Sequence, residues 1–248
     1  GRASAANGRG PERAAGQYPD KITKHCKPAA AEAAGEVIES AGIGVTGPEC
    51  VGDTGRPAIS KGLIGAAREA ARENLDVLGP LVEEGYDVVV IEPSDAVMFQ
   101  SDYLDLYPDP VTERVAEHTY GVCEYIDAFR LDEALSFGPD SDPLAYHGHC
   151  HQKATKKDHH AVGILRRAGY RVDPLDSGCC GMAGSFGYEA EHYSMSQAIG
   201  RILFDQIEDS DGDAVVAPGA SCRSQLSDDD FEGERPAHPV EKLHEALA

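Results

Sequence analysis

Two adjacent cysteines, Cys179 and Cys180, stand between glycines in the stretch "DSGCCGMAGSFGYE". A disulfide between sequence neighbours closes almost no loop, so it removes almost no conformational entropy from the unfolded chain. The pair is therefore a poor structural cross-link. Metal ligation and thiol redox chemistry are the functions that two neighbouring thiols on a flexible support can serve, and a chance pairing is the alternative.

An internal repeat indicates which elements position this pair. The stretch "KHCKPAAAEAAGEVIESAGIGVTGPECVGDTGRP" from Lys24 aligns with "GHCHQKATKKDHHAVGILRRAGYRVDPLDSGCCGMAG" from Gly148. Further on, "LDVLGPLVEEGYDVVVIEPSD" aligns with "IGRILFDQIEDSDGDAVVAPGASC". In both copies an amphipathic helix leads through a polar turn into a short β-branched strand, which predicts α/β units with parallel sheets flanked by helices. We expect two such units in tandem.

The repeat also predicts the domain organisation. Residues 1–19 are rich in Gly, Ala and Arg and lack hydrophobic periodicity, so a flexible linker is expected there. Residues 20–140 then form a first domain and residues 141–248 a second. A chain of 248 residues is long enough for two domains of this size.

The cysteines of the second copy are matched mostly by other residue types in the first copy. The matched pairs are Cys150 with Cys26, Cys179 with Asp53, Cys180 with Thr54, and Cys222 with Asp95. One copy therefore carries four thiols where the other keeps one. We interpret the first copy as a scaffold that has lost its site.

The four cysteines of the second copy are predicted to meet at one edge of its sheet. Cys150 follows the predicted strand "PLAYHG", the adjacent pair follows the next strand, and Cys222 follows "AVVAP". Loops at the carboxyl ends of parallel strands converge, and open α/β sheets assemble their sites there. Four thiolates on three such loops suit an iron–sulfur cluster, and we expect a 4Fe-4S cluster held by Cys150, Cys179, Cys180 and Cys222.

Glycines and histidines near these cysteines are candidates for supporting roles. Gly178 and Gly181 would let the backbone approach closely and present N–H groups to the sulfurs. His149 and His151 flank Cys150 and could donate hydrogen bonds to a cluster. His149 is the first histidine candidate for direct ligation, because its counterpart in the first copy, His25, also precedes a cysteine; His147 is a further histidine of this segment.

Other chemistry is open to the same thiols. Four cysteines can hold a tetrahedral zinc ion, although structural zinc usually draws on C-x2-C pairs and the sequence contains none. Cys179 and Cys180 could also form a redox couple with Cys150 as the resolving thiol. A scaffold or binding module without a metal is the remaining alternative. Ordinary small residues, not ligands, are expected at Cys26, Cys50 and Cys123.

The charge balance argues against several partners. The chain has 22 basic and 43 acidic side chains, a formal net charge of -21 at pH 7, which repels nucleic acid and anionic membranes. Such a surface is typical of halophilic proteins, and an ordinary acidic protein is the alternative. No apolar run approaches 18 residues, so we expect no transmembrane segment and a cytoplasmic location, with any attachment at the inner face of the membrane made through partners.

Several segments resemble one known family. They are "HCHQKA", "SGCCGMAGSFGYE" and "APGASCRSQL" in the second copy and "GRPAISKG" and "IEPSDA" in the first. The chain is similar to the cysteine-rich CCG domain pair, which occurs in iron–sulfur subunits of glycolate oxidase, anaerobic glycerol-3-phosphate dehydrogenase and heterodisulfide reductase, and in lactate utilisation proteins. The likeness runs from Asp20 to the end and looks closest to the C-terminal part of fused FAD-linked D-lactate dehydrogenases.

The resemblance implies an electron-transfer part of an oxidoreductase that acts on CH–OH groups, with no catalytic residue in this chain. FAD in a partner domain or subunit would oxidise a 2-hydroxy acid such as D-lactate or glycolate. A ferredoxin-type iron–sulfur domain would pass the electrons to the cluster in this chain, and a quinone or another carrier would accept them. A thiol–disulfide redox domain like that of heterodisulfide reductase is the alternative within the family.

The chain departs from the family pattern at two places. The family motif ends in C-x2-C, whereas Gly219 stands at the first of these two positions and Cys222 at the second. The unusual noncubane cluster of heterodisulfide reductase is therefore not expected, and a simpler cluster with four thiolates is. Because Asp53, Thr54 and Asp95 stand at cysteine positions of the first copy, a second cluster is not expected there.

Overall fold

The computed structural model describes residues 14–18, 28–47, 52–138, 142–227 and 235–248. The first half of the chain contains, in order, β1 (Ala14–Tyr18), α2 (Pro28–Ser40), β2 (Gly44–Thr46), α3 (Arg56–Ser60), α4 (Ile64–Glu83), β3 (Tyr86–Val90), α5 (Pro93–Val97), the π-helical turn η1 (Met98–Asp102), α6 (Tyr103–Leu106), α7 (Pro110–Glu117), β4 (Thr119–Gly121), α8 (Val122–Ala128) and the 3-10 turn η2 (Leu131–Ala134).

The second half is shorter and follows a similar alternation. It contains β5 (Pro143–Tyr146), α9 (Cys150–Ala154), α10 (His159–Arg167), β6 (Arg171–Pro174), the 3-10 turn η3 (Phe186–Tyr188), α11 (Tyr193–Glu208), β7 (Ala214–Val216), α12 (Ala220–Gln225) and α13 (Pro239–Glu245). Among the described residues, no helix combines the length and the apolar character that crossing a membrane would require.

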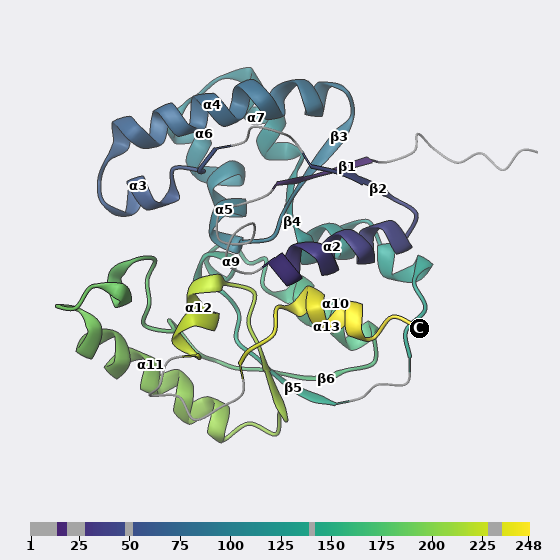
Figure 1. Cartoon of the computed structure of the whole chain (residues 1–248), viewed down its shortest axis with the longest axis vertical. Coiled ribbons are helices and arrows are strands. Elements are labelled where there is room, and N and C mark those ends of the chain that lie inside the picture. The colour runs from purple at the N-terminus through teal and green to yellow at the C-terminus, as the bar shows by residue number, and fades with distance from the viewer. Residues whose placement is uncertain (1–13, 19–27, 48–51, 139–141, 228–234) are drawn as a thin grey trace, which may run out of the picture.

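Each half contributes one parallel sheet. The strand order is β2-β1-β3-β4 in the first sheet and β6-β5-β7 in the second, and every neighbouring pair within these sheets runs parallel. Helices flank both sheets (Figure 1). This confirms the predicted fold class, because parallel strands require crossover connections and the helices of the repeat supply them.

Strand β1 corrects the predicted linker. Ala14–Tyr18 lies inside the segment expected to be flexible, yet it pairs with both β2 and β3. Ala15 and Tyr18 are fully buried and belong to the hydrophobic clusters on opposite faces of the sheet. The sequence "AAGQY" is too short and too poor in β-branched residues to carry a strand pattern, so the linker prediction is wrong here. The rest of that segment lies outside the described residues.

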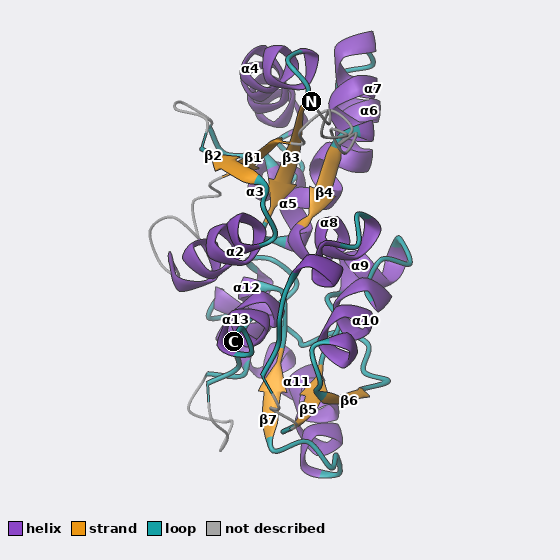
Figure 2. Ribbon diagram, turned by 90° about the vertical axis from the view of Figure 1, so that its right-hand side faces the viewer, coloured by secondary structure: helices purple, strands orange, loops and turns teal. Residues whose placement is uncertain are grey.

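Helices α2, α8, α10 and α13 form a layer between the two sheets (Figure 2). One hydrophobic cluster runs through this layer and includes Val37 and Ile126 from the first half and Ile164 and Leu243 from the second. A second cluster lies between the first sheet and α4, and a third lies near α11 and α12. Because the halves share the central cluster, the expected division into residues 20–140 and 141–248 stays a prediction.

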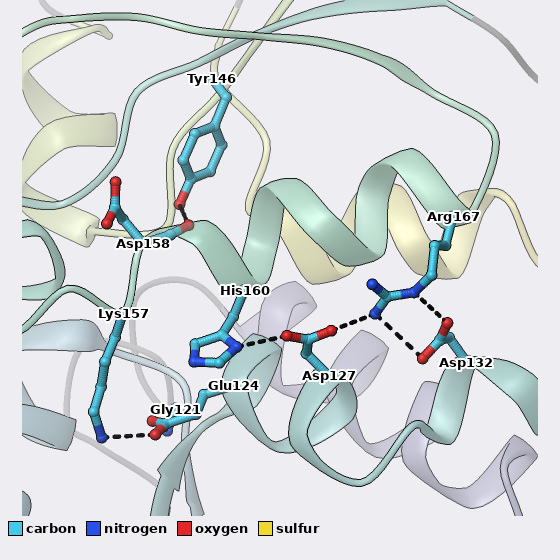
Figure 3. A network of polar contacts seen from close by, with 9 residues as sticks. All are labelled: Gly121, Glu124, Asp127, Asp132, Tyr146, Lys157, Asp158, His160 and Arg167. Atoms are coloured by element: carbon cyan, nitrogen blue, oxygen red, sulfur yellow. Dashed lines mark hydrogen bonds and ion pairs between the residues drawn. The ribbon is translucent and has the colours of Figure 1, made fainter.

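Ion pairs also join the halves, along the seam between α8 and α10 (Figure 3). Lys157 Nζ lies 2.6 Å from Glu124 Oε1, and His160 Nδ1 lies 2.6 Å from Asp127 Oδ2. Arg167 pairs with both Asp127 and Asp132. Burial alone would raise the pKa of Asp127, but hydrogen bonds from His160 and Arg167 outweigh it and hold that pKa below its ordinary value.

Replacing this carboxylate should weaken the seam in a pH-dependent way. We expect Asp127→Asn to lower the free energy of unfolding at pH 7 by about 1 kcal/mol. A carboxylate with a depressed pKa in the folded state stabilises the protein above its unfolded pKa and loses that contribution as pH falls. The difference between variant and wild type should therefore shrink between pH 7 and pH 3 in urea unfolding. Glu133→Gln, which removes only the exposed pair with Arg130, should change little, and a gap independent of pH would contradict the assignment.

Candidate metal centre

A cavity of about 500 Å³ lies between the two halves, at the carboxyl ends of strands from both sheets. The four predicted ligands, Cys150, Cys179, Cys180 and Cys222, all line it. The first half lines the same cavity with Asp53, Thr54 and Asp95, the residues that the repeat matches with three of these cysteines. The two equivalent strand-end regions therefore face one space, which the sequence did not predict.

The cysteines reach the cavity from three separate elements. Cys150 is the first residue of α9, the adjacent pair lies in the loop after β6, and Cys222 lies in α12. Cys150 is exposed and Cys179 half-buried, whereas Cys180 and Cys222 are only 4% and 2% exposed. The structure thus places the four thiols around one cavity, while their role as ligands stays a prediction.

The buried end of the cavity is the most compact part of the group. The sulfurs of Cys180 and Cys222 and a ring nitrogen of His147 all lie within 4.8 Å of one another. At the outer side, the N–H of Gly181 donates to Cys179 Sγ at 3.3 Å. Soft sulfur donors, an imidazole and a backbone N–H directed at a sulfur fit a zinc ion or an iron–sulfur cluster.

The electrostatics of the thiols favour a cation. A hydrogen bond with Cys180, followed by burial, raises the pKa of Cys179 well above its ordinary value. A hydrogen bond from Cys179 lowers the pKa of Cys180, but the contact with Cys222 and burial raise it by more. Burial and the neighbouring Cys179 likewise raise the pKa of Cys150. Crowded thiols therefore stay protonated on their own, and a bound metal ion would reverse this by stabilising the thiolates.

Burial keeps the nearby histidines neutral. It lowers the pKa of His147 to about 4, that of His149 to about 3 and that of His151 to about 4, with the surrounding cationic groups adding to the effect. Nδ1 of His151 is buried and has no hydrogen-bond partner among the described residues. Since His151 lines the cavity, this nitrogen can serve a bound group.

His149 caps the helix that carries Cys150. Its Nδ1 accepts the N–H of His151 at 3.3 Å and caps α9, so its proton lies on Nε2, which is 3.9 Å from Glu92 Oε1. The ring also fills the space beside Gly219, where an added Cβ would stand 2.3 Å from His149 Cδ2. Only Nδ1 is engaged in a hydrogen bond, because 3.9 Å is too long for one between Nε2 and Glu92, and His149 as a ligand stays a prediction. The ring also explains why position 219 has no side chain.

Glu92 is a functional candidate that the sequence analysis missed. Its side chain comes from the turn after β3, is 5% exposed, and accepts the N–H of Ala220 at 2.8 Å through Oε2. Ala220 begins α12, the helix that carries Cys222. The signal was present in the repeat, because "EPSD" aligns with "GASC" and places Glu92 opposite Gly219.

The first half closes its own version of the site with direct hydrogen bonds. The hydroxyl of Thr54 donates to Asp95, and these positions match Cys180 and Cys222, which are neighbours in the second half. Asp53 accepts the N–H of Gly55 at 2.8 Å. The matched positions therefore lie together in both copies. Of the remaining cysteines, Cys123 is buried in the central cluster, where burial raises its pKa to about 12, and Cys26 and Cys50 lie outside the described residues.

The part of the chain that carries the four cysteines matches a known protein family. Residues 144–227 match the family model described as the CCG cysteine-rich domain. The predicted resemblance is thereby confirmed, and the matched range contains all four cysteines that line the cavity. The expected closeness to fused FAD-linked D-lactate dehydrogenases stays a prediction.

Curated relatives extend the similarity beyond the CCG domain. The chain is 30% identical over 198 residues to one subunit of the anaerobic glycerol-3-phosphate dehydrogenase of Escherichia coli, covering 78% of this chain and 49% of that protein. It is 26% identical to D-2-hydroxyglutarate dehydrogenase of E. coli, covering 78% and 19%. With lactate utilization protein A of Bacillus cereus it shares 24% identity, covering 75% and 79%. The chain thus spans about half the length of the glycerol-3-phosphate dehydrogenase polypeptide and a smaller part of the hydroxyglutarate enzyme.

A solved structure shares the fold. A hypothetical protein from Helicobacter pylori superposes with a TM-score of 0.56 at 12% identity, covering 96% of this chain and 49% of that one. At this identity the likeness shows a common fold and nothing about activity. It does show that the arrangement of the two halves recurs as a unit.

The two glycines predicted to support the cysteines differ in what they require. Gly181 has φ +95°, and an added Cβ would lie 2.2 Å from the backbone oxygen of Ser196. At Gly178 an added Cβ would have nothing within 4 Å, so the expected close approach is not seen there.

We expect Gly181→Ala to lower the free energy of unfolding by about 3 kcal/mol and Gly178→Ala by less than about 0.5 kcal/mol, measured by thermal or urea unfolding. Equal effects would contradict this account.

Removing the Glu92 carboxylate should disturb the start of α12. In Glu92→Ala the buried N–H of Ala220 loses its acceptor, which should cost about 2 kcal/mol of unfolding free energy. Glu92→Gln retains an acceptor oxygen and should cost less. The matched control is Ser94→Ala, which removes one hydroxyl bond to Glu92 and leaves the contact with Ala220 intact. If Ser94→Ala destabilised the protein as much as Glu92→Ala, the link between the halves would not be the cause.

Proposed function

We propose that this chain is the iron–sulfur electron-transfer module of an FAD-linked dehydrogenase that oxidises a 2-hydroxy acid or a related CH–OH substrate. The observation that carries the proposal is the convergence of four cysteines, from three strand-end loops, on one cavity. The curated relatives support it, because two of them are named as dehydrogenases or dehydrogenase subunits and the third as a lactate utilization protein. The substrate class comes from those relatives.

Cys150, Cys179, Cys180 and Cys222 would hold the cluster, for which we keep the 4Fe-4S type. When bound, such a cluster supplies one-electron transfer. The chain's own residues would set its surroundings. Burial of Cys180 and Cys222 keeps water from one side, and the Gly181 N–H directed at Cys179 Sγ would favour the reduced state, since hydrogen bonds to sulfur tune reduction potential.

The chain spans only part of the two dehydrogenase relatives, so we infer that other domains or subunits carry the rest of the electron path. The flavin site belongs in this proposal to a separate domain or subunit, with a ferredoxin-type iron–sulfur domain between the flavin and this module. A quinone or another carrier would take the electrons onward. A cytoplasmic location, with attachment to the membrane through partners, and an acidic surface adapted to high salt belong to the same proposal.

A mononuclear zinc site is the second candidate, and one observation favours it. Cys180, Cys222 and His147 lie close enough together to serve a single tetrahedral ion. The thiol–disulfide alternative is less well supported. Reactive thiols need a lowered pKa, whereas the pKa values of Cys179 and Cys180 are raised.

Metal analysis of anaerobically purified protein separates these candidates. We expect about four iron and four acid-labile sulfide per chain and an EPR signal after reduction, as a 4Fe-4S cluster requires. Cys180→Ser should abolish or alter the signal while the circular dichroism spectrum stays unchanged, because Thr54 occupies the matching position in the first half. Cys123→Ala, which removes a buried thiol that does not line the cavity, should leave the signal intact. A colourless protein with one zinc per chain would overturn the electron-transfer function.

A further inference from the structure

We propose that His147 supplies a nitrogen ligand to the metal centre, beside Cys180 and Cys222. The inference rests on the proposed function for the identity of the metal, and it goes beyond that function by giving a histidine the place of one of the four cysteines, since a 4Fe-4S cluster takes one protein ligand at each iron. The three donor atoms lie within 4.8 Å of one another, and all three side chains are buried, His147 to 1% exposure. Side chains that bind a metal from the buried end of the cavity would lie in this position.

Ser177 orients the His147 ring for this role. Ser177 Oγ lies 2.6 Å from His147 Nδ1, and both residues are buried. The Ser177 carbonyl in turn accepts a hydrogen bond from Lys153 Nζ. Metal-bound histidines characteristically engage their second nitrogen in a hydrogen bond, which fixes the ring and leaves the other nitrogen for the metal. Nε2 is therefore the nitrogen available to the metal.

The backbone places His147 at the same sheet edge as Cys222. His147 directly follows β5, and its N–H donates to the carbonyl of Val216 at 2.9 Å, at the end of β7. The chain then continues from β7 into α12 and Cys222. The two donors are thus held by neighbouring strands of one sheet, whose spacing varies little.

The repeat distinguishes His147 from the other nearby histidines. In the alignment His149 is matched by His25, in the copy that has lost three of its four thiols, so a histidine at this place does not depend on a metal site. His147 is matched by Thr23, so it is present in the copy with four thiols and absent from the other. His147 therefore occurs only in the copy that has the four cysteines. This supports a shared role for His147 and the cysteines as metal ligands.

Pulsed EPR on the full chain tests the proposal, first on the wild-type protein and then on variants. The reduced protein, grown with ordinary or with ¹⁵N-labelled histidine, should show a strongly coupled nitrogen whose spectrum changes on labelling. His147→Gln should remove this coupling, and the matched variant His149→Gln should retain it. In His147→Cys the cluster should remain and its midpoint potential should fall, because an anionic thiolate replaces a neutral imidazole. A cluster with no histidine nitrogen coupled to it, or a coupling that persists in His147→Gln, would overturn the proposal.

X-ray absorption at the metal edge separates this inference from the function on which it rests. If the purified chain holds zinc instead of iron, a shell with both sulfur and nitrogen that loses its nitrogen in His147→Gln would support His147 as a ligand while refuting the iron–sulfur function. A shell with sulfur alone would refute both. With iron present, an all-sulfur shell would refute the ligand assignment and leave electron transfer standing.

Discussion

The buried Glu92 carboxylate joins the two halves of the molecule beside the cavity where we propose the metal centre. It accepts the N–H of Ala220, a residue 128 positions further along the chain, and Cys222 follows two residues later in the same helix. A buried carboxylate is tolerated when hydrogen bonds satisfy it, and here the opposing half supplies the N–H donor. The position of one candidate ligand therefore depends on the copy that lacks the thiols.

This dependence explains what the first copy contributes. In that copy, Thr54 and Asp95 satisfy each other by a direct hydrogen bond, and they stand where the second copy has Cys180 and Cys222. A hydroxyl and a carboxylate form a strong hydrogen bond, whereas thiols are weak donors and weak acceptors. The first site is thus complete without a metal. In the second site, where the pKa values of Cys179 and Cys180 are raised, a bound cation would stabilise the thiolates.

The sequence predicted the internal topology of each half but not how the halves pack. Helical and strand periodicities identified β3, β5 and β7, and the glycine turns placed the cysteines at strand ends, since such patterns report burial within one unit. The strand Ala14–Tyr18 was missed because its small residues carry no strand pattern. The opposed walls of the cavity and the contact of Glu92 were missed because a repeat describes each copy separately. His149 as a ligand stays a prediction, and the structure adds that its ring caps α9.

The four thiols differ in burial between the closed end and the open end of the cavity. Cys180 and Cys222 lie at the closed end with His147, while Cys150 is exposed at the start of α9. Near the outer part of the cavity, Tyr188 is 65% exposed, and an ion pair between Lys61 and Glu189 joins the halves. In the proposed function, a redox partner can approach the side of Cys150 and not the buried side. The closed end would then set the potential and the open end would exchange electrons, so substitutions at the two ends should affect different measurable properties.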